Sequence, residues 1–432
     1  MCCFNVTIPN DSIAVKRPVP AKKQSRPIAL IGATIHTVSG ETIENGILTF
    51  KEGRIETVSK GFPLPSGYER IDCKGKHIYP GLFSASTTLG LNEIGAVRAT
   101  RDMSETGRIN PNVRAEVAVN PESELIPVTR VNGITTAFTA PQGGIISGTG
   151  AIINLDGWTY EDMTVKSRAA LIVNFPSMRL STSRFEQRSE EEQKKDRDKS
   201  LNELRDAFND AKAYWKAKQS EVKSGTPYHN NDSRWEAMIP FLEKKAPVLV
   251  WASDMLQIEA AVAWAEEMDI KIIIGNGNDA WRVTELLKKK NIPVLAASIH
   301  RLPEKNDDAY DEPFLLPKKL HDAGIQYCIT ADEGGDGNYR NLPYQAATAV
   351  AHGLPYEEGL KAITLYPAQI FGVADRMGSL EVGKDATLII TNGDILDIRT
   401  NVEMEFIEGK KIDLSSRHTQ LYEKYKMKYG KE

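Results

Sequence analysis

Short apolar runs alternate with helical patterns over most of this chain, and this alternation is the feature that most constrains its fold. It is typical of parallel strands joined by crossover helices, because a strand that returns to its sheet in the same direction needs a long covering connection. We therefore expect an α/β fold with a (β/α)8 TIM-like barrel. The expected strands are residues 77–86, 133–140, 169–176, 247–252, 270–276, 293–299 and 325–331, with an eighth candidate at 148–155.

Both ends of the chain have a different sequence pattern, in which short strand-like runs are separated by turns that contain glycine. They lie at residues 29–35, 46–50 and 54–58 near the start, and at 386–390 and 402–407 near the end. Each group alone would make a marginal sheet, so we expect both to form one small composite β-sandwich. The expected domains are a flexible arm (1–27), the composite β-sandwich (28–76 plus 377–413), the barrel (77–376) and a C-terminal tail (414–432).

Residues 184–222 form an insertion that is crowded with charged and amide side chains. Apolar residues recur in it at three- and four-residue spacing, which is the period of one helix face. The sequence therefore predicts an amphipathic helix with a solvated outer face; a helix that binds a partner protein is the alternative. The apolar positions are Leu201, Leu204, Phe208, Ala211 and Trp215.

The charge balance excludes some classes of partner. The 54 Lys and Arg residues oppose 58 Asp and Glu residues, so the net charge is −4. Such a balance gives no support for binding to nucleic acid. No apolar run approaches the ~20 residues that cross a bilayer, and the start of the chain lacks the apolar stretch of an export signal. We expect a cytoplasmic protein that binds a small molecule; the alternative is an exported protein whose signal was removed.

The cysteines have neither the spacing of a disulfide framework nor that of metal ligands. Cys73 and Cys328 lie in apolar, strand-like contexts, where small buried thiols are expected. Cys2 and Cys3 adjoin the first Met and are interpreted as an inert flexible end, with a lipidation remnant or a truncated export signal as the alternatives.

Several short stretches resemble one known family. They are residues 53–55, 78–82, 364–368 and 378–386. Together they resemble the amidohydrolase superfamily, and within it the branch similar to imidazolonepropionase, over roughly residues 28 to 412. The resemblance implies a barrel with a composite β-sandwich and hydrolysis of C–N bonds in non-peptide substrates. These motifs are architectural, so they do not establish activity.

The resemblance also implies one or two divalent metal ions, with zinc as the expected type, held by a His-x-His pair, two later His and one Asp. This chain has Ser86 and Thr88 at the pair. Trp251 and Asn276 occupy the later positions, and only Asp332 matches. Hydroxyl groups are poor zinc ligands, and an indole nitrogen can only donate a hydrogen bond. We therefore predict a degenerate metal site without a bound metal.

Two further features are expected at the mouth of the barrel. His300 follows the predicted strand 293–299, which places it at the C-terminal mouth as a substrate contact, a proton carrier or an ordinary loop residue. The Gly-rich residues 141–150 also follow a strand. They lack the Lys-Ser/Thr ending of a phosphate loop, so tight backbone turns are expected there.

The loop after the first barrel strand is polar and rich in arginine. Arg98 and Arg101 are suited to clamp a carboxylate group of a ligand. The alternative is that they pair with Asp102 and Glu105 and hold the loop in place.

Two functional hypotheses follow. In the first, the protein hydrolyses a C–N bond in a cyclic amide or an amino-acid derivative, with a much reduced or absent metal site. In the second, the barrel has lost hydrolysis and serves as a ligand-binding or scaffolding subunit, as a homo-oligomer or beside an active relative. The predicted catalytic residues are Asp332 and His300, and the predicted substrate contacts are Trp251, Asn276, Arg98, Arg101, Ser86 and Thr88.

Overall fold

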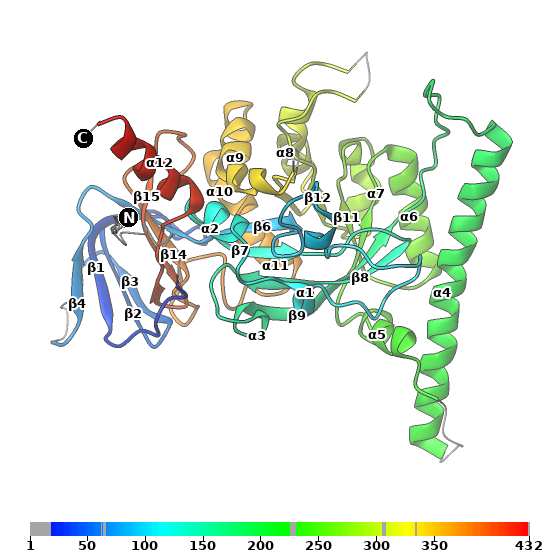
Figure 1. Cartoon of the computed structure of the whole chain (residues 1–432), viewed down its shortest axis with the longest axis horizontal. Helices are drawn as coiled ribbons and strands as arrows, with labels where there is room; N and C mark the ends of the chain where they lie inside the picture. Colours follow the sequence, from blue (N-terminus) through cyan, green and yellow to red (C-terminus); the bar gives the residue numbers. More distant parts are fainter. Residues whose placement is uncertain are drawn as a thin grey trace, which may run out of the picture.

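The computed structural model describes residues 19–61, 63, 66–224, 230–304, 308–332 and 335–430, so Cys2 and Cys3 lie outside the described residues. Figure 1 shows a small sheet beside both described chain ends, and a larger β/α unit that carries the long helix α4 (Glu190–Ser224) on its far side. The predicted α/β class, a TIM-like barrel with a second sheet domain, is confirmed.

Eight strands form the nearly closed barrel sheet and follow one another through it in chain order. Seven of them run in the same direction, whereas β8 is antiparallel to both of its neighbours. The strands are β6 (Leu82–Thr87), β7 (Ile134–Thr139), β8 (Ile146–Asn154), β9 (Thr164–Asn174), β10 (Val248–Trp251), β11 (Ile272–Gly275), β12 (Val294–Ala296) and β13 (Tyr327–Ile329).

The direction of β8 differs from the parallel arrangement that the alternation predicted. Residues 140–145 connect β7 to β8, and residues 155–163 connect β8 to β9. A parallel return needs a crossover of about a dozen residues or more, so both connections are too short for one. The apolar run at 148–155 was therefore identified as a strand, but its direction follows from the lengths of the loops around it.

The predicted strand at 77–86 is two strands in the structure. β5 (His77–Pro80) belongs to the small sheet, whereas β6 begins the barrel sheet. The chain passes between them at Gly81, whose N–H donates to the carbonyl oxygen of Thr387. A Cβ atom at Gly81 would lie 2.1 Å from Oγ1 of Thr135, so the close approach requires glycine.

The small sheet joins both chain ends, as the sequence predicted. β14 pairs antiparallel with β5, with Leu388 opposite Pro80 and Thr391 opposite His77. In sheet order the strands are β16 (Lys410–Lys411), β15 (Val402–Ile407), β14 (Leu388–Thr391), β5, β1 (Ile28–Ile35), β2 (Ile43–Lys51) and β3 (Arg54–Ser59), with β4 (Glu69–Asp72) paired to β1.

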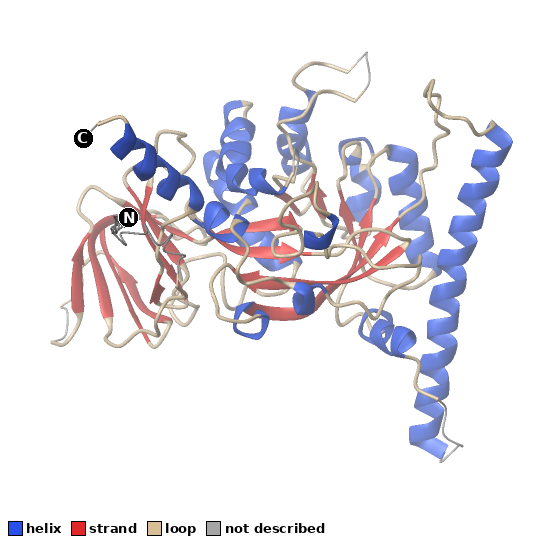
Figure 2. Cartoon of the chain, in the orientation of Figure 1, coloured by secondary structure: helices blue, strands red, loops and turns tan. Residues whose placement is uncertain are grey.

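Helices flank the strands of the larger unit (Figure 2). The predicted amphipathic helix is α4, in which Leu204, Phe208 and Ala211 are fully buried. Within the described ranges, no helix is both long and apolar enough to cross a membrane. The other helices are α1 (Ala115–Ala118), α2 (Leu125–Arg130), α3 (Tyr160–Met163), α5 (Ser233–Leu242), α6 (Met255–Glu267), α7 (Thr284–Lys289), α8 (Glu312–Asp322), α9 (Leu342–Ala351), α10 (Tyr356–Ala362), α11 (Leu365–Ile370) and α12 (Arg417–Lys428), and the 3-10 helices are η1 (Arg98–Thr100), η2 (Ala280–Arg282) and η3 (Asp336–Asn341).

The interior of the barrel is packed with apolar side chains. These side chains form one apolar cluster, which includes Phe371. Its ring stacks on that of Phe138, with ring centroids 4.3 Å apart. As predicted, Cys328 and Cys73 are buried free thiols. Because the interior is filled, a ligand site is expected at the carboxyl ends of the strands. The barrel strands contribute Phe83, Phe138, Ile152, Ile172, Leu249, Ile273, Leu295 and Cys328 to the interior cluster.

Candidate functional site

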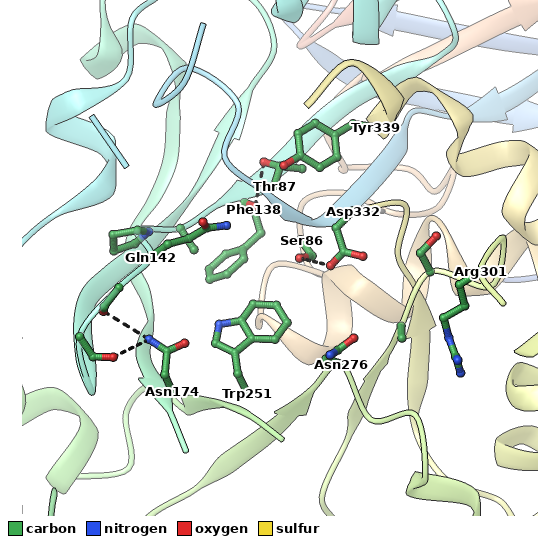
Figure 3. Close-up of a pocket in the computed structure, with 16 residues that line it drawn as sticks. Ser86, Thr87, Phe138, Gln142, Asn174, Trp251, Asn276, Arg301, Asp332 and Tyr339 are labelled. Carbon is green, nitrogen blue, oxygen red and sulfur yellow. Dashed lines mark hydrogen bonds between the residues drawn. The ribbon is translucent and has the colours of Figure 1, made fainter. Parts of the chain in front are cut away.

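The carboxyl ends of the parallel strands open into a cavity of about 690 Å³ (Figure 3). In the strand register, Asn174 of β9 lies opposite Trp251 of β10, and Trp251 lies opposite Gly275 of β11. In Figure 3 the Trp251 ring lies between Asn174 and the pair formed by Ser86 and Asp332. The lining residues are Ser86, Thr87, Phe138, Ala140, Pro141, Gln142, Gly143, Gly144, Asn174, Trp251, Asn276, Ala297, Ser298, Arg301, Asp332 and Tyr339.

Asp332 supplies a carboxyl group to this cavity. Its Oδ2 accepts a hydrogen bond of 2.8 Å from Ser86 Oγ, and its Oδ1 accepts one of 3.3 Å from Thr330 Oγ1. Burial raises the pKa of Asp332, because the charged form loses hydration, and the bond from Ser86 partly opposes this effect. The protonated acid is therefore favoured over a wider pH range than for an ordinary aspartate, and it can both donate and accept a hydrogen bond.

Ser86 and Thr88 have different roles, although the sequence placed both at the ligand site. Ser86 lines the cavity, whereas Thr88 is buried and is not among the lining residues. Thr88 Oγ1 donates to Asp336 Oδ1 at 2.5 Å, and its backbone N–H donates to Tyr339 Oη at 3.0 Å. The Tyr339 hydroxyl also donates to Asp336, at 2.9 Å. Thr88 therefore ties η3 to the first barrel strand.

Trp251 and Asn276, which the sequence analysis proposed as ligand contacts, both line the cavity. The Trp251 side chain is half-buried, and Gly275 leaves room for its ring, since a Cβ there would lie 2.5 Å from Trp251 Cε3. Asn276 is exposed and has a φ of 64°, a left-handed conformation that Asn adopts more readily than most residues. The mouth thus presents an aromatic ring and a polar amide.

The donor groups at this site do not fit the divalent metal that the resemblance implies. Beside Asp332, the described residues at the expected ligand positions of the cavity present a hydroxyl that already donates to it, an indole and an amide, from Ser86, Trp251 and Asn276. A catalytic zinc usually takes three protein ligands from His, Cys, Asp or Glu. Among the residues that the structure describes, no group of three or more such side chains could hold a metal ion.

His300 does not line the cavity, although it follows β12. Its Nε2 lies 2.7 Å from Thr348 Oγ1 on α9, and its backbone N–H donates to Gln345 Oε1 at 3.0 Å. Burial lowers the pKa of His300, because the imidazolium loses hydration. The structure thus places His300 against a helix, while the next residue, Arg301, lines the cavity.

Arg98 and Arg101 are also absent from the cavity lining, and their side chains are exposed in the loop after β6. In the described part of the chain, neither forms an ion pair with Asp102 or Glu105. The structure therefore supports neither of the two roles that the sequence suggested for these arginines.

Several lining residues were missed by the sequence reasoning. Asn174 had a usable signal, because it stands near the end of the predicted strand 169–176, as Trp251 does in 247–252. Gln142 and Arg301 lie in loops, whose paths an apolar pattern does not predict. Phe138 and Tyr339 also line the cavity.

Known structures and family patterns support this architecture. Residues 272–413 match the amidohydrolase family. The crystal structure of an amidohydrolase from Thermotoga maritima MSB8 superposes with a TM-score of 0.79 at 26% identity, over 89% of this chain and 99% of that one.

Two curated proteins are similar in sequence. Amidohydrolase tasK of Hapsidospora irregularis is 22% identical over 388 residues, which cover 85% of this chain and 39% of that protein. Imidazolonepropionase of Bacteroides thetaiotaomicron is 34% identical over 88 residues, which cover 20% of this chain and 21% of that protein. The alignments thus span about two fifths and one fifth of these relatives, and the similarity to imidazolonepropionase is local.

Proposed function

We propose that this amidohydrolase-type barrel binds a small polar molecule in its mouth without a catalytic metal. One observation carries the proposal: the carboxyl group of Asp332 lies in a cavity of about 690 Å³ and accepts a hydrogen bond from Ser86, and the other described side chains that line this cavity are unsuited to zinc. Sites of this kind, concave with a few polar groups beside aromatic walls, are typical of small-molecule binding.

The lining residues suggest which molecules fit. With its raised pKa, Asp332 can donate a proton to a ligand carbonyl in a hydrogen bond or accept one from an N–H group. The Trp251 ring offers an apolar face to a flat group, and the Asn276 amide offers both a donor and an acceptor. Cyclic amides and amino-acid derivatives combine these features.

Hydrolysis of a C–N bond is the second candidate, and the amidohydrolase-family match of residues 272–413 favours it. In this reading, ionised Asp332 accepts the proton of a water molecule that attacks the amide carbon, and returns it to the leaving nitrogen. The raised pKa of Asp332 supports such a role, because a general base works best when its pKa lies near the working pH.

A thermal-shift screen of lactams, cyclic ureides and amino-acid derivatives, with and without EDTA, tests the proposal. Binding should survive EDTA and weaken by ~1–3 kcal/mol in Asp332→Ala, which loses a hydrogen bond to a buried carboxyl group. Asp206→Ala is the matched control, because Asp206 is an exposed carboxylate on α4. Binding that is lost in EDTA, or that is equally strong in Asp332→Ala, would contradict the proposal. Ring-opened product in NMR spectra of the same mixtures would favour the second candidate.

A further inference from the structure

The side-chain amide of Asn174 is held in one orientation by the Gly-rich loop. Its Nδ2 donates to the carbonyl oxygens of Gly143 at 3.3 Å and Gly144 at 3.0 Å, and to Ser147 Oγ at 2.9 Å. Carbonyl oxygens can only accept, so the NH2 group of Asn174 must face the loop. Its Oδ1 must therefore face the other way.

Ser147 reinforces this orientation. Its hydroxyl donates to the carbonyl oxygen of Gly143 at 2.6 Å, which uses its one proton, so towards Asn174 it can only accept. The backbone N–H of Asn174 also donates to the carbonyl oxygen of Ile145, at 2.9 Å. Main chain and side chain are thus both bound to residues 143–147, and the amide cannot turn over without losing these bonds.

The free end of the amide faces the ligand cavity. Asn174 lines the cavity, and Figure 3 shows its oxygen on the side of the Trp251 ring. Within the described ranges, no side chain or backbone group donates to Asn174 Oδ1. Asn174 Oδ1 is open to the cavity, so a ligand that covers it takes it out of contact with water. Such a ligand must supply a hydrogen-bond donor, because an acceptor that is buried without one costs affinity.

We propose that Asn174 selects the ligand by requiring a hydrogen-bond donor, an N–H group in the plane of a flat molecule that packs on Trp251. This inference rests on the proposed binding function. Because the same amide holds Gly143 and Gly144, Asn174 also couples the ligand to the Gly-rich loop. The sequence reasoning had assigned only tight backbone turns to that loop.

A pair of probes that differ in one N–H group tests this role. 2-Pyrrolidinone has an amide N–H, and N-methyl-2-pyrrolidinone carries a methyl group instead. Titration by ligand-observed NMR should show wild-type protein binding the first roughly 2- to 12-fold more tightly, the factor for one net hydrogen bond. The preference should disappear in Asn174→Ala, which removes the acceptor and leaves room for the methyl group.

Asn202→Ala is the matched control, because Asn202 is an exposed amide on α4 that takes no part in the hydrogen bonds of Asn174. It should retain the preference for 2-pyrrolidinone, and circular dichroism should show that both variants are folded. Equal binding of the probes to wild-type protein, or a preference that persists in Asn174→Ala, would overturn the role of Asn174 while leaving a cavity that depends on Asp332. Binding of neither probe, or binding that Asp332→Ala does not change, would overturn the proposed function and this inference together.

Discussion

Glu405 of β15 is expected to make the stability of the protein decrease with rising pH. Its side chain is fully buried, and neither carboxyl oxygen has a hydrogen-bond partner among the described residues. The nearby Arg130 is already bound to Asp156 Oδ1 at 2.9 Å and to the carbonyl oxygen of Leu155 at 2.8 Å. Burial therefore raises the pKa of Glu405 well above its ordinary value of 4.5, with Arg130 opposing the shift.

The direction of the pH effect on stability depends on whether the folded or the unfolded chain releases the Glu405 proton first. Below the ordinary pKa, Glu405 is protonated in both the folded and the unfolded chain, and it contributes no pH dependence. Above it, the unfolded chain ionises while the folded chain keeps its proton, so rising pH favours unfolding. The free energy of unfolding then falls by about 1.4 kcal/mol for each pH unit, until the folded pKa is reached.

Glu405→Gln removes the titrating group and keeps the side-chain shape. The buried amide of the variant changes the free energy of unfolding by the same amount at each pH. Only the change with pH in the stability difference between variant and wild type therefore reports on the ionisation of Glu405. Urea unfolding followed by tryptophan fluorescence should show the stability of the variant, relative to wild type, rising by up to about 1.2 kcal/mol between pH 5 and pH 6. Glu44→Gln, at an exposed site in the same sheet, should show no such rise. A difference that is the same at both pH values would refute the reasoning, because it would mean that Glu405 is ionised in the folded protein.

Two further predictions concern the metal and the composite sheet. Protein loaded with excess zinc, manganese or iron and then desalted should retain well under one equivalent per chain by elemental analysis, because Asp332 is the one metal-type ligand among the described residues that line the cavity. One tightly held equivalent, lost in Asp332→Ala, would contradict this. Deletion of residues 385–432 should make the remaining chain aggregate, because it removes β14 and leaves the edge of β5 unpaired; a stable monomeric fragment in size-exclusion chromatography would count against a composite domain.

Family motifs made part of the candidate site predictable. Asp332, Trp251 and Asn276 stand at the ends of apolar runs, and parallel strands bring their carboxyl ends to one face of a barrel. That argument needs only the chain direction and the strand ends. The same argument does not place His300 in the cavity lining. The conformation of the loop after β12 sets the direction of its side chain, and His300 contacts Thr348.

The sequence by itself determined the elements and their broad grouping. Apolar side chains that face the core recur with the period of a helix or a strand, and this period is visible in each local stretch of sequence. The long helix α4, the barrel strands and the sheet shared by both ends all follow from that period. Strand direction and side-chain pairing depend on contacts between distant residues. Only the tertiary structure therefore decided three features. Loop length sets the reversal of β8, close packing sets the passage between sheets at Gly81, and hydrogen bonds to the Gly-rich loop set the orientation of the Asn174 amide.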